Sequence, residues 1–340
     1  MTMTPLNFLI AGCGSAGRSV AHVASQDGRG QIAALVDPQP HQLEKQLELY
    51  PDATTGADYT ALLKDTQPDV VVIAGPDYLH AEQTLLALKH GCHVLVEKPL
   101  ATTTADARRV VEAAAASDRQ VMTDHTMRYM HPWGAMARAA QEGQIGEIFF
   151  IQGDYIHDMW SYYAAEGSTH TPWRADQIHP QNILLGGGCH PIDLILWTIE
   201  SPVEELFAYA NKMTVPEFPD NDCYILSLRF QNGALGKVFV SSGCSGHGMG
   251  GGMLAVYGAG GSLWQGQLYR RGAKPVAFAD TSGTVVGGHG WGGAVVDFLD
   301  VLEGNKPNPI PARAGARTVA ICEAALASIA SGRPQKPQEF

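Results

Sequence analysis

A glycine-rich turn near the N-terminus is the feature that most constrains the fold. Residues 6–11 form an apolar run that predicts a buried strand, residues 12–17 read Gly-Cys-Gly-Ser-Ala-Gly, and apolar residues at helical spacing follow. This Gly-x-Gly-x-x-Gly pattern between a strand and a helix is typical of dinucleotide-binding domains. Gly12 permits the tight turn, Gly14 lets the backbone approach a pyrophosphate, and Gly17 lets the helix pack closely on the strand.

The same turn indicates which groups meet the cofactor. Backbone N–H groups at the helix N-terminus, including those of Ser15 and Ala16, would face the phosphates. A second strand, residues 32–36, ends at Asp37, 20 residues after Gly17, which is the spacing of a carboxylate that binds the adenosine ribose. No Arg or Lys lies next to Asp37, so NAD is favoured over NADP. The alternative is a turn residue that only ends the strand.

Strands and helices alternate through the first part of the chain, which predicts an α/β fold with a doubly wound parallel sheet. We expect a Rossmann NAD(P)-binding domain at residues 1–127 and a second domain at residues 128–340. The further elements expected in the first domain are helices at 42–50 and 78–89, strands at 70–74 and 94–98, a helix capped near Thr103 and a strand at 120–123.

One of these strands delivers Glu97 and Lys98 to its carboxyl end, where Pro99 follows. In open parallel sheets, ligands bind outside the carboxyl ends of the strands, so both side chains would lie beside the cofactor. The simpler alternative is a surface Glu-Lys pair that ends a strand.

The loop after the preceding strand should also lie over the cofactor. Gly75, Pro76 and Asp77 follow that strand directly, and His80 comes one turn later. We therefore assign all four residues to cofactor binding. A buried histidine satisfied at the start of a helix explains His80 equally well.

The second domain is expected to be α+β, with a large, mainly antiparallel open sheet. Helices would cover one face, and the other face is a candidate oligomer surface. The glycine-rich run at residues 243–261 is predicted to form turns and a flexible loop, because no helix follows it. The expected elements are a helix at 133–141, a strand at 147–156, repeated strands between 206 and 278, and a helix at 317–329.

An aromatic stretch in this domain suits a sugar or polyol. His157, Asp158, Trp160, Trp173 and Arg174 combine rings that stack on a pyranose face with groups that read hydroxyls. For any single aromatic residue, packing in the core is the commoner role.

A second glycine run precedes a candidate catalytic histidine. Pro191 suits the first position of a helix, so His190 would fall at the N-cap and Asp193 would lie on the same face. The helix dipole disfavours an imidazolium there, which keeps His190 able to accept a proton. A buried stripe of an amphipathic helix is the alternative.

These ordered motifs resemble the Gfo/Idh/MocA oxidoreductases, which include inositol dehydrogenases and glucose-fructose oxidoreductase. The resemblance implies that Lys98 polarises the substrate oxygen, that His190 is the general base and that Asp193 holds a neighbouring hydroxyl. We also assign Arg128, His157, Asp158, Trp160 and Trp173 to the substrate and Arg174 to the cofactor. The motifs are Gly12-x-Gly14-x-x-Gly17, Glu97-Lys98-Pro99, His125 to Arg128, Trp173-Arg174 and Gly186-Gly187-Gly188-x-His190-x-x-Asp193.

One position departs from the inositol dehydrogenase pattern. Those enzymes usually carry an Asp four residues before the histidine, and here that position is Gly186. Either His190 works without that carboxylate, or Asp158, His157 or His179 substitutes for it.

Composition excludes several classes of function. A net charge of −11 without a basic stripe argues against nucleic acid and anionic membranes as partners. The six cysteines are scattered without metal-ligand spacing, so we expect reduced thiols in a cytoplasmic protein and no metal. We expect neither a secretion signal nor a membrane anchor.

Together these patterns predict an NAD-dependent oxidoreductase that acts on a secondary hydroxyl of a sugar, cyclitol or glycoside, as a homodimer or homotetramer. The first alternative is a redox-neutral enzyme that cleaves or epimerises a glycoside through transient oxidation. The second is a non-catalytic sensor of a sugar or dinucleotide.

Overall fold

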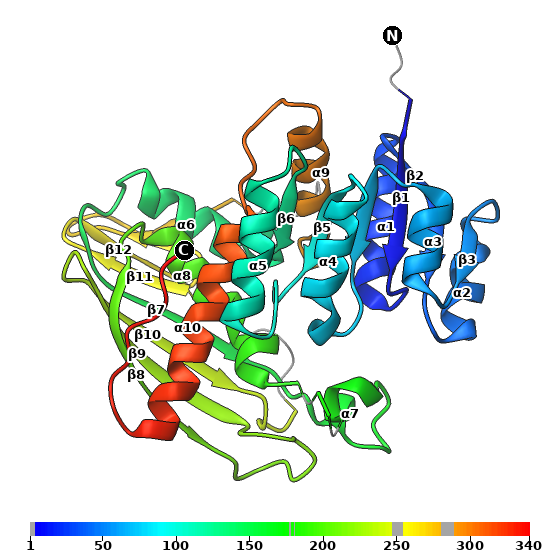
Figure 1. The fold of residues 1–340 in the computed structure, drawn as a ribbon. Helices are drawn as coiled ribbons and strands as arrows, with labels where there is room; N and C mark the ends of the chain where they lie inside the picture. The colour runs from blue at the N-terminus through cyan, green and yellow to red at the C-terminus, as the bar shows by residue number, and fades with distance from the viewer. Residues whose placement is uncertain (1–3, 177, 180, 247–253, 280–288) are drawn as a thin grey trace. The chain divides into compact units, whose positions relative to one another are not determined.

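The computed structural model describes residues 4–176, 178–179, 181–246, 254–279 and 289–340. The chain divides into two compact units, Met1–Thr126 with Thr284–Ala316, and Met127–Gly283 with Arg317–Phe340. Each unit has its own sheet (Figure 1). The division differs from a single boundary after residue 127, because a later segment returns to the first unit, where its helix α9 (Trp291–Leu302) packs on α1 (Ser15–Asp27).

The first unit holds a parallel sheet of six strands in the described part of the chain, in the order β3-β2-β1-β4-β5-β6. The prediction of a doubly wound sheet is confirmed, and the strand order reverses between β1 and β4, where ligands bind in such sheets. The strands are β1 (Leu6–Ala11), β2 (Gly30–Val36), β3 (Thr54–Gly56), β4 (Val70–Ile73), β5 (His93–Glu97) and β6 (Val121–Asp124).

Helices connect these strands. The expected cap at Thr103 is confirmed, since its hydroxyl accepts a hydrogen bond from the backbone N–H of Asp106 at 3.1 Å. β3, α3 and α9 were not expected: β3 is too short to show a pattern, and α9 follows the whole sheet of the second unit in the sequence. The helices besides α1 and α9 are α2 (Pro40–Leu47), α3 (Tyr59–Thr66), the 3₁₀ turn η1 (Asp77–Leu79), α4 (His80–Lys89) and α5 (Thr104–Ala115).

The second unit contains a sheet of eight strands among the described residues, in the order β14-β13-β12-β11-β7-β10-β9-β8. Neighbouring strands are antiparallel except β7 and β10, which are parallel, so the expected mainly antiparallel open sheet is confirmed. The strands are β7 (Ile148–Ile156), β8 (Val203–Asn211), β9 (Cys223–Phe230), β10 (Leu235–Ser241), β11 (Leu254–Gly258), β12 (Gly261–Trp264), β13 (Gln267–Tyr269) and β14 (Val276–Ala277).

The hairpin between β9 and β10 shows how sequence sets the register of this sheet. Gly233 turns the chain with a φ of +89°, and the Asn232 side chain accepts from the N–H of Ala234 at 3.2 Å. The expected hairpin at Asn232-Gly233 is therefore confirmed. Of the predicted glycine-rich loop at residues 243–261, residues 247–253 lie outside the described residues, and Gly258 and Gly261 belong to strands.

Helices of the second unit pack on its sheet. α6 and α8 both contact strands of the central part of the sheet, which supplies the expected helical layer on one face. The helices are η2 (Thr126–Tyr129), α6 (Trp133–Gln141), α7 (Trp160–Tyr163), η3 (Pro172–Ala175), the π-helical turn η4 (Leu184–Gly188), α8 (Cys189–Thr198) and α10 (Ala312–Ser331), in which the chain passes from the first unit to the second.

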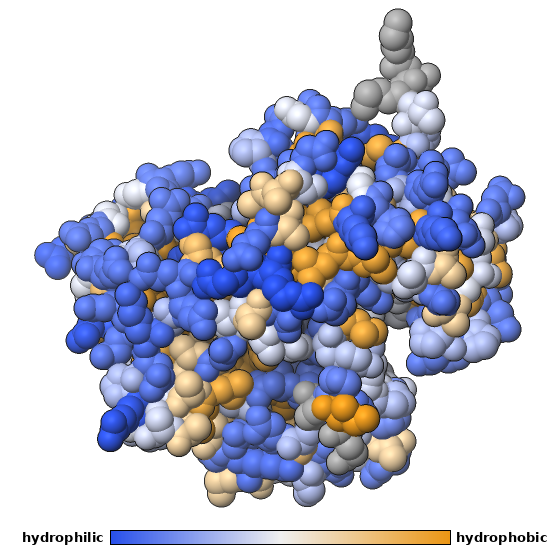
Figure 2. Space-filling view, in the orientation of Figure 1, coloured by the Kyte–Doolittle hydropathy of each residue, from blue (hydrophilic) through white to orange (hydrophobic). Residues whose placement is uncertain are grey.

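The face of the molecule seen in Figure 2 is mainly polar. In the view of Figure 2 hydrophilic residues predominate, and apolar residues lie in separate patches. Among the described residues, no helix combines the length and the apolar character needed to cross a membrane.

Candidate active site

The carboxyl ends of the parallel strands bring the predicted cofactor residues of the first unit to one edge of its sheet. The segment Gly12–Gly17 follows β1, Asp37 follows β2, and Gly75–Asp77 follows β4. Glu97 is the last residue of β5, and Lys98 comes next. Residues that are widely separated in the sequence therefore share the edge where the strand order reverses.

Glycine occupies the three positions of the first turn for different physical reasons. Gly12 has a φ of +97°, and a Cβ there would lie 2.6 Å from the backbone of Ala74. A Cβ on Gly17 would lie 1.9 Å from the carbonyl oxygen of Gly12. A Cβ on Gly14 would meet no described atom within 4 Å. Packing within the protein thus requires Gly12 and Gly17, whereas the open space at Gly14, beside the N-terminus of α1, fits the close approach of a phosphate.

Asp37 is held in place by backbone donors. One carboxylate oxygen accepts from the N–H of Cys13 and the other from the N–H of Gln39, both at 2.9 Å. The carboxylate is thereby fixed between the end of β2 and the glycine turn, and its remaining lone pairs are what a ribose hydroxyl would meet. Burial, together with the charge of Asp37, raises the pKa of the Cys13 thiol to about 12, so this thiol stays protonated.

His80 ties two loops of this edge together. Its buried ring places Nδ1 2.7 Å from the carbonyl oxygen of Pro99 and Nε2 3.1 Å from that of Gly75. These contacts correspond to the alternative of a satisfied structural histidine. Any influence of His80 on a cofactor would pass through the positions of the Gly75 and Pro99 segments.

The end of β5 forms a cluster that sequence reasoning found only in part. The Glu97 carboxylate accepts from Trp291 Nε1 at 2.8 Å and from the backbone N–H of Lys98 at 3.2 Å. Asp124, at the end of β6, pairs with Glu97 in the strand register. Burial and then the charge of Glu97 raise the pKa of Asp124 well above its usual range. The strand-end rule that selected Lys98 could have selected Asp124, whereas Trp291 had no local signal.

The glycine run of the second unit forms a π-helical turn that continues directly into α8. The prediction that His190 is an N-cap is therefore wrong: the chain is already helical from Leu184, and Pro191 is the third residue of α8. The argument that a free helix N-terminus keeps His190 neutral loses its basis. Turns of this type are frequent at functional sites.

Close packing explains the three glycines of this turn. A Cβ on Gly186 would lie 2.8 Å from the side-chain amide of Gln181, and one on Gly187 would lie 2.5 Å from the ring of Tyr155. A Cβ on Gly188 would lie 2.8 Å from two aliphatic side chains. The glycines therefore let side chains of this turn and of the neighbouring strands reach the backbone just before His190.

An aromatic ring packs on His190. The ring of Tyr155 stacks on that of His190 with centroids 5.8 Å apart, and the Tyr155 hydroxyl lies 3.0 Å from His157 Nδ1. Burial raises the pKa of Tyr155, so its hydroxyl stays protonated and can donate. The structure thus connects two predicted residues, His190 and His157, through a tyrosine that sequence reasoning did not single out.

The side chain of Gln181 packs on Gly186. Its Oε1 accepts from the guanidinium of Arg174 and from the hydroxyl of Tyr163, the latter at 3.0 Å. Because this amide fills the space beside Gly186, a neutral group from five residues earlier in the chain takes the space that a side chain at position 186 would need. Arg174 also lies over the rings of Trp173 and Tyr162, with its Cζ 4.8 Å and 5.5 Å from their centroids. Its assignment to the cofactor stays a prediction.

Arg128 and Asp193 form a buried ion pair. Nε and Nη2 of Arg128 donate to the two oxygens of Asp193 at 2.7 Å and 2.6 Å. The guanidinium also lies over Trp197, 5.0 Å from the ring centroid. This bidentate pair fixes α8 against the segment at residue 128, and direct binding of a substrate by either residue stays a prediction.

The other candidates of the second unit lie at loops. Asp158 accepts from the N–H groups of Trp160 and Gly246, at 3.1 Å and 2.7 Å, and so ties two loops together. Trp160 is 39% exposed and available to a ligand. His179 is exposed beside Asp176. Neither the fixed Asp158 nor the exposed His179 fills the place beside Gly186.

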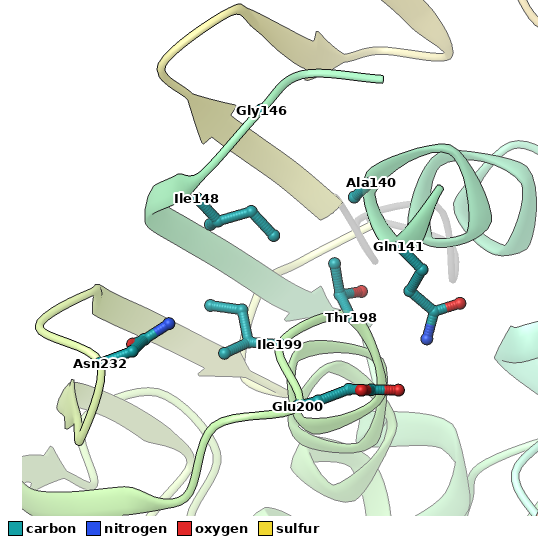
Figure 3. A pocket seen from close by; sticks show the side chains of 8 residues that line it. All are labelled: Ala140, Gln141, Gly146, Ile148, Thr198, Ile199, Glu200 and Asn232. Carbon is teal, nitrogen blue, oxygen red and sulfur yellow. The ribbon is translucent and has the colours of Figure 1, made fainter. Parts of the chain in front are cut away.

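A separate hollow of about 260 Å³ lies elsewhere on the second unit, at the end of α6 and the start of β7 (Figure 3). None of the predicted site residues lines it, so it carries no part of the assignment. Its lining residues are Ala140, Gln141, Gly146, Ile148, Thr198, Ile199, Glu200 and Asn232.

The different roles of the first-turn glycines can be separated by substitution. We expect Gly17→Ala to lower the free energy of unfolding by about 1–3 kcal/mol, because its Cβ overlaps the Gly12 carbonyl. Gly14→Ala should change it by less than about 1 kcal/mol but weaken NADH binding about tenfold or more. Urea unfolding and NADH fluorescence titration measure both. A Gly14→Ala protein that binds NADH like the parent would contradict this assignment.

The packing of Gln181 on Gly186 predicts a strong coupling. Gly186→Ala should cost about 1–3 kcal/mol of unfolding free energy, because its Cβ would displace the buried amide. In the double variant Gly186→Ala/Gln181→Ala, we expect at least about 0.5 kcal/mol of the summed single costs to be recovered. Denaturant unfolding of the four proteins measures this coupling, and additive costs would show that the two residues do not compete for one space.

Comparisons with known proteins agree with this architecture. Residues 6–125 match the oxidoreductase family with an NAD-binding Rossmann fold, and residues 133–264 match the GFO/IDH/MocA C-terminal domain. One relative is a 1-carboxy-3-chloro-3,4-dihydroxycyclo hexa-1,5-diene dehydrogenase from Comamonas testosteroni, which is 26% identical over 68% of this chain. The aligned part covers 57% of that relative's length. An inositol 2-dehydrogenase from Rubrobacter xylanophilus is 29% identical over 81% of this chain and 77% of its own length.

Solved structures share the fold. A levoglucosan dehydrogenase in complex with NADH superposes with a TM-score of 0.86 at 21% identity, over 99% of this chain and 100% of the other. At that identity the similarity establishes the fold alone. The two family matches follow one another along most of the chain. The protein therefore belongs to the Gfo/Idh/MocA family of NAD-binding oxidoreductases.

Proposed function

We propose that this protein is an NAD-dependent dehydrogenase or reductase that transfers a hydride between nicotinamide and the carbon of a secondary hydroxyl in a sugar, cyclitol or glycoside. The observation that carries the proposal is the position of Lys98. It follows β5 on the same sheet edge as the glycine turn, with its backbone N–H bound to the buried Glu97 carboxylate. An amine held at the edge where a dinucleotide binds suits work on a substrate oxygen.

The residues of the first unit would hold NAD by its phosphates and its ribose. The turn Gly12–Gly17 and the N-terminus of α1 would take the pyrophosphate, and Asp37 would accept from the ribose hydroxyls. The carboxylate at Asp37, with Pro38 and Gln39 after it, would repel a 2′-phosphate, which favours NAD over NADP. Bound NAD supplies the hydride acceptor or donor.

In the proposed mechanism, the protein's own groups handle the hydroxyl proton. Lys98 would donate a hydrogen bond to the substrate oxygen, and His190 would accept the hydroxyl proton as the carbon is oxidised. The stacking of the Tyr155 ring on the His190 ring supports the proposal, because Tyr155 is itself held by a hydrogen bond to His157 and so fixes the orientation of the imidazole. The Arg128–Asp193 ion pair would hold α8, and with it His190, in place.

The substrate class is proposed from side chains and relatives together. Exposed Trp160 and part-exposed Trp173 offer rings to a sugar face. Two similar proteins named above act, by their names, on inositol and levoglucosan. Both are polyhydroxylated rings with secondary hydroxyls, which favours that class over simple alcohols.

We further propose a homo-oligomer in the cytoplasm. Tyr209, Ile225 and Phe239 form one row across β8, β9 and β10, and Tyr209 and Ile225 are 67% and 42% exposed. An apolar row on an open sheet suits a second copy of the chain.

The proposed cytoplasmic location rests on the cysteines. All six cysteines are free in the structure, which suits a reducing compartment.

If copies of the chain meet at this apolar row, a charge introduced there should separate them. Ile225→Glu should convert the homodimer or homotetramer to monomers, because a carboxylate would be buried between copies. Light scattering measures the mass, and Glu204→Gln, which alters an exposed residue of β8, serves as the control. A parent protein that is monomeric at all concentrations would contradict the proposed oligomer.

The activity is tested with NAD⁺ and a panel of free sugars, inositols and aryl glycosides, with reduced nicotinamide and released aglycone followed together. We expect nicotinamide reduction with one class of substrate. Lys98→Ala and His190→Ala should each lower turnover about 100-fold or more while NADH binding persists, and His179→Ala should change neither.

Each other outcome identifies an alternative. Aglycone release without NADH would indicate the redox-neutral enzyme. Tight NADH binding with no turnover on any substrate would indicate the sensor. Full activity of both the Lys98 and the His190 variant would refute the proposed mechanism.

A further inference from the structure

Two buried carboxyl groups end neighbouring strands of the first unit. Glu97 and Asp124 are the last partners in the β5–β6 ladder, and because the ladder is parallel, their side chains leave the sheet on the same face. Glu97 is 9% exposed and Asp124 is 1% exposed. Ionising Asp124 beside a second buried carboxyl group carries a large cost, which favours its protonated form.

The contacts decide which group is ionised. Glu97 accepts two N–H hydrogen bonds, from Trp291 and from the backbone of Lys98, and both favour its charged form. No N–H donor among the described residues reaches either oxygen of Asp124, whose hydrogen-bonding neighbour is the carboxyl of Glu97. A hydrogen bond between two carboxyl groups requires one of them to carry the proton.

Charges around the pair point the same way. Burial first, and then the charge of Glu97, raise the pKa of Asp124, while the nearby charge of Lys98 lowers it without reversing the shift. His289 packs its ring on Trp291 with centroids 4.9 Å apart, and burial lowers the pKa of His289, so this residue adds no positive charge at neutral pH. The positive charge of Lys98 thus acts on both Asp124 and His289.

We propose that Asp124 is a positioning residue that stays protonated and donates a hydrogen bond to Glu97, so that the pair places a single negative charge beside Lys98. The protonated state of Asp124 follows from the geometry of the first unit. Its consequence for Lys98 rests on the proposed function. Two negative charges would hold the lysine firmly as an ammonium ion, whereas a single shared charge leaves it able to exchange a proton with a substrate oxygen.

Infrared spectroscopy of the whole protein tests the protonated state directly. At pH 7 we expect the carbonyl band of a protonated carboxylic acid, which should be missing in Asp124→Asn, a variant of the same shape that is permanently neutral. Aspartate labelled with ¹³C at the carboxyl should shift the band in the parent, which keeps the test valid if the variant folds poorly. Absence of the band from the parent would overturn the proposal.

The pH dependence of unfolding tests it by a second route. A protonated Asp124 releases its proton on unfolding once the pH exceeds the ordinary aspartate pKa of about 3.9, so rising pH favours the unfolded parent. The unfolding constant of the parent divided by that of Asp124→Asn should increase about tenfold per pH unit above about pH 4, until Asp124 ionises in the folded protein. A ratio that stays flat or falls as the pH rises would show that Asp124 is ionised.

The charge beside Lys98 is tested without any substrate. Carbamylation of its ε-amino group by cyanate at pH 8, followed by mass spectrometry, reports how readily the lysine loses its proton. Asp124→Asn should react at the rate of the parent, whereas Glu97→Gln/Asp124→Asn, which removes the charge of the pair, should react several-fold faster.

Each other result has a definite meaning. Faster carbamylation of Asp124→Asn alone would show that Asp124 carried a charge. An unchanged rate in the double variant would show that the pair does not act on Lys98. Because none of these readouts needs turnover, a failure of the proposed dehydrogenase activity is distinguishable from a failure of this inference.

Discussion

The candidate site of the first unit depends on one constraint, the common edge at which parallel strands end. At the carboxyl ends of β1, β4, β5 and β6 the backbone leaves the sheet, and different residues follow each strand there. β1 leads to the open space at Gly14, β5 presents Glu97 and Lys98, and β6 presents Asp124. Since the sheet buries its strands on both faces, this edge is where polar groups of the strands can meet a ligand.

At the same edge, hydrogen-bond donors limit the negative charge that the buried pair Glu97 and Asp124 carries. Glu97 takes two N–H donors, one of them from Trp291 on the returning helix α9, and Asp124 beside it has none among the described residues. Nearly complete burial makes this difference in donors decisive. A helix of the first unit that follows the sheet of the second unit in the sequence therefore helps to fix the charge next to Lys98.

The features that could be predicted from the sequence are those that depend on a local pattern of residues. The glycine turn, the strand expected at 94–98 and the helix cap at Thr103 each depend on neighbours in the chain, and the structure has all three, with the strand at His93–Glu97. Trp291 could not be found in this way, because it contacts Glu97 across a long stretch of sequence. Gln181 is close to Gly186 in the sequence, but no pattern showed that its side chain folds back onto that glycine.

His190 shows how a local rule can also fail. Proline commonly starts a helix, but here it follows a π-helical turn that three glycines make possible by admitting side chains of the turn and of the neighbouring strands. The absence of an Asp at Gly186 was visible in the sequence. That a glutamine held by Arg174 and Tyr163 would fill the space required the tertiary structure.

The central claim is hydride transfer between NAD and a secondary hydroxyl carbon. The most direct measurement uses a substrate found in the panel, deuterated at one carbinol carbon at a time, with mass spectrometry of the nicotinamide after incubation. The account predicts that deuterium from one carbon is transferred to the cofactor and accumulates there as reduced nicotinamide forms. Product formation from every labelled substrate without deuterium in the nicotinamide would contradict it.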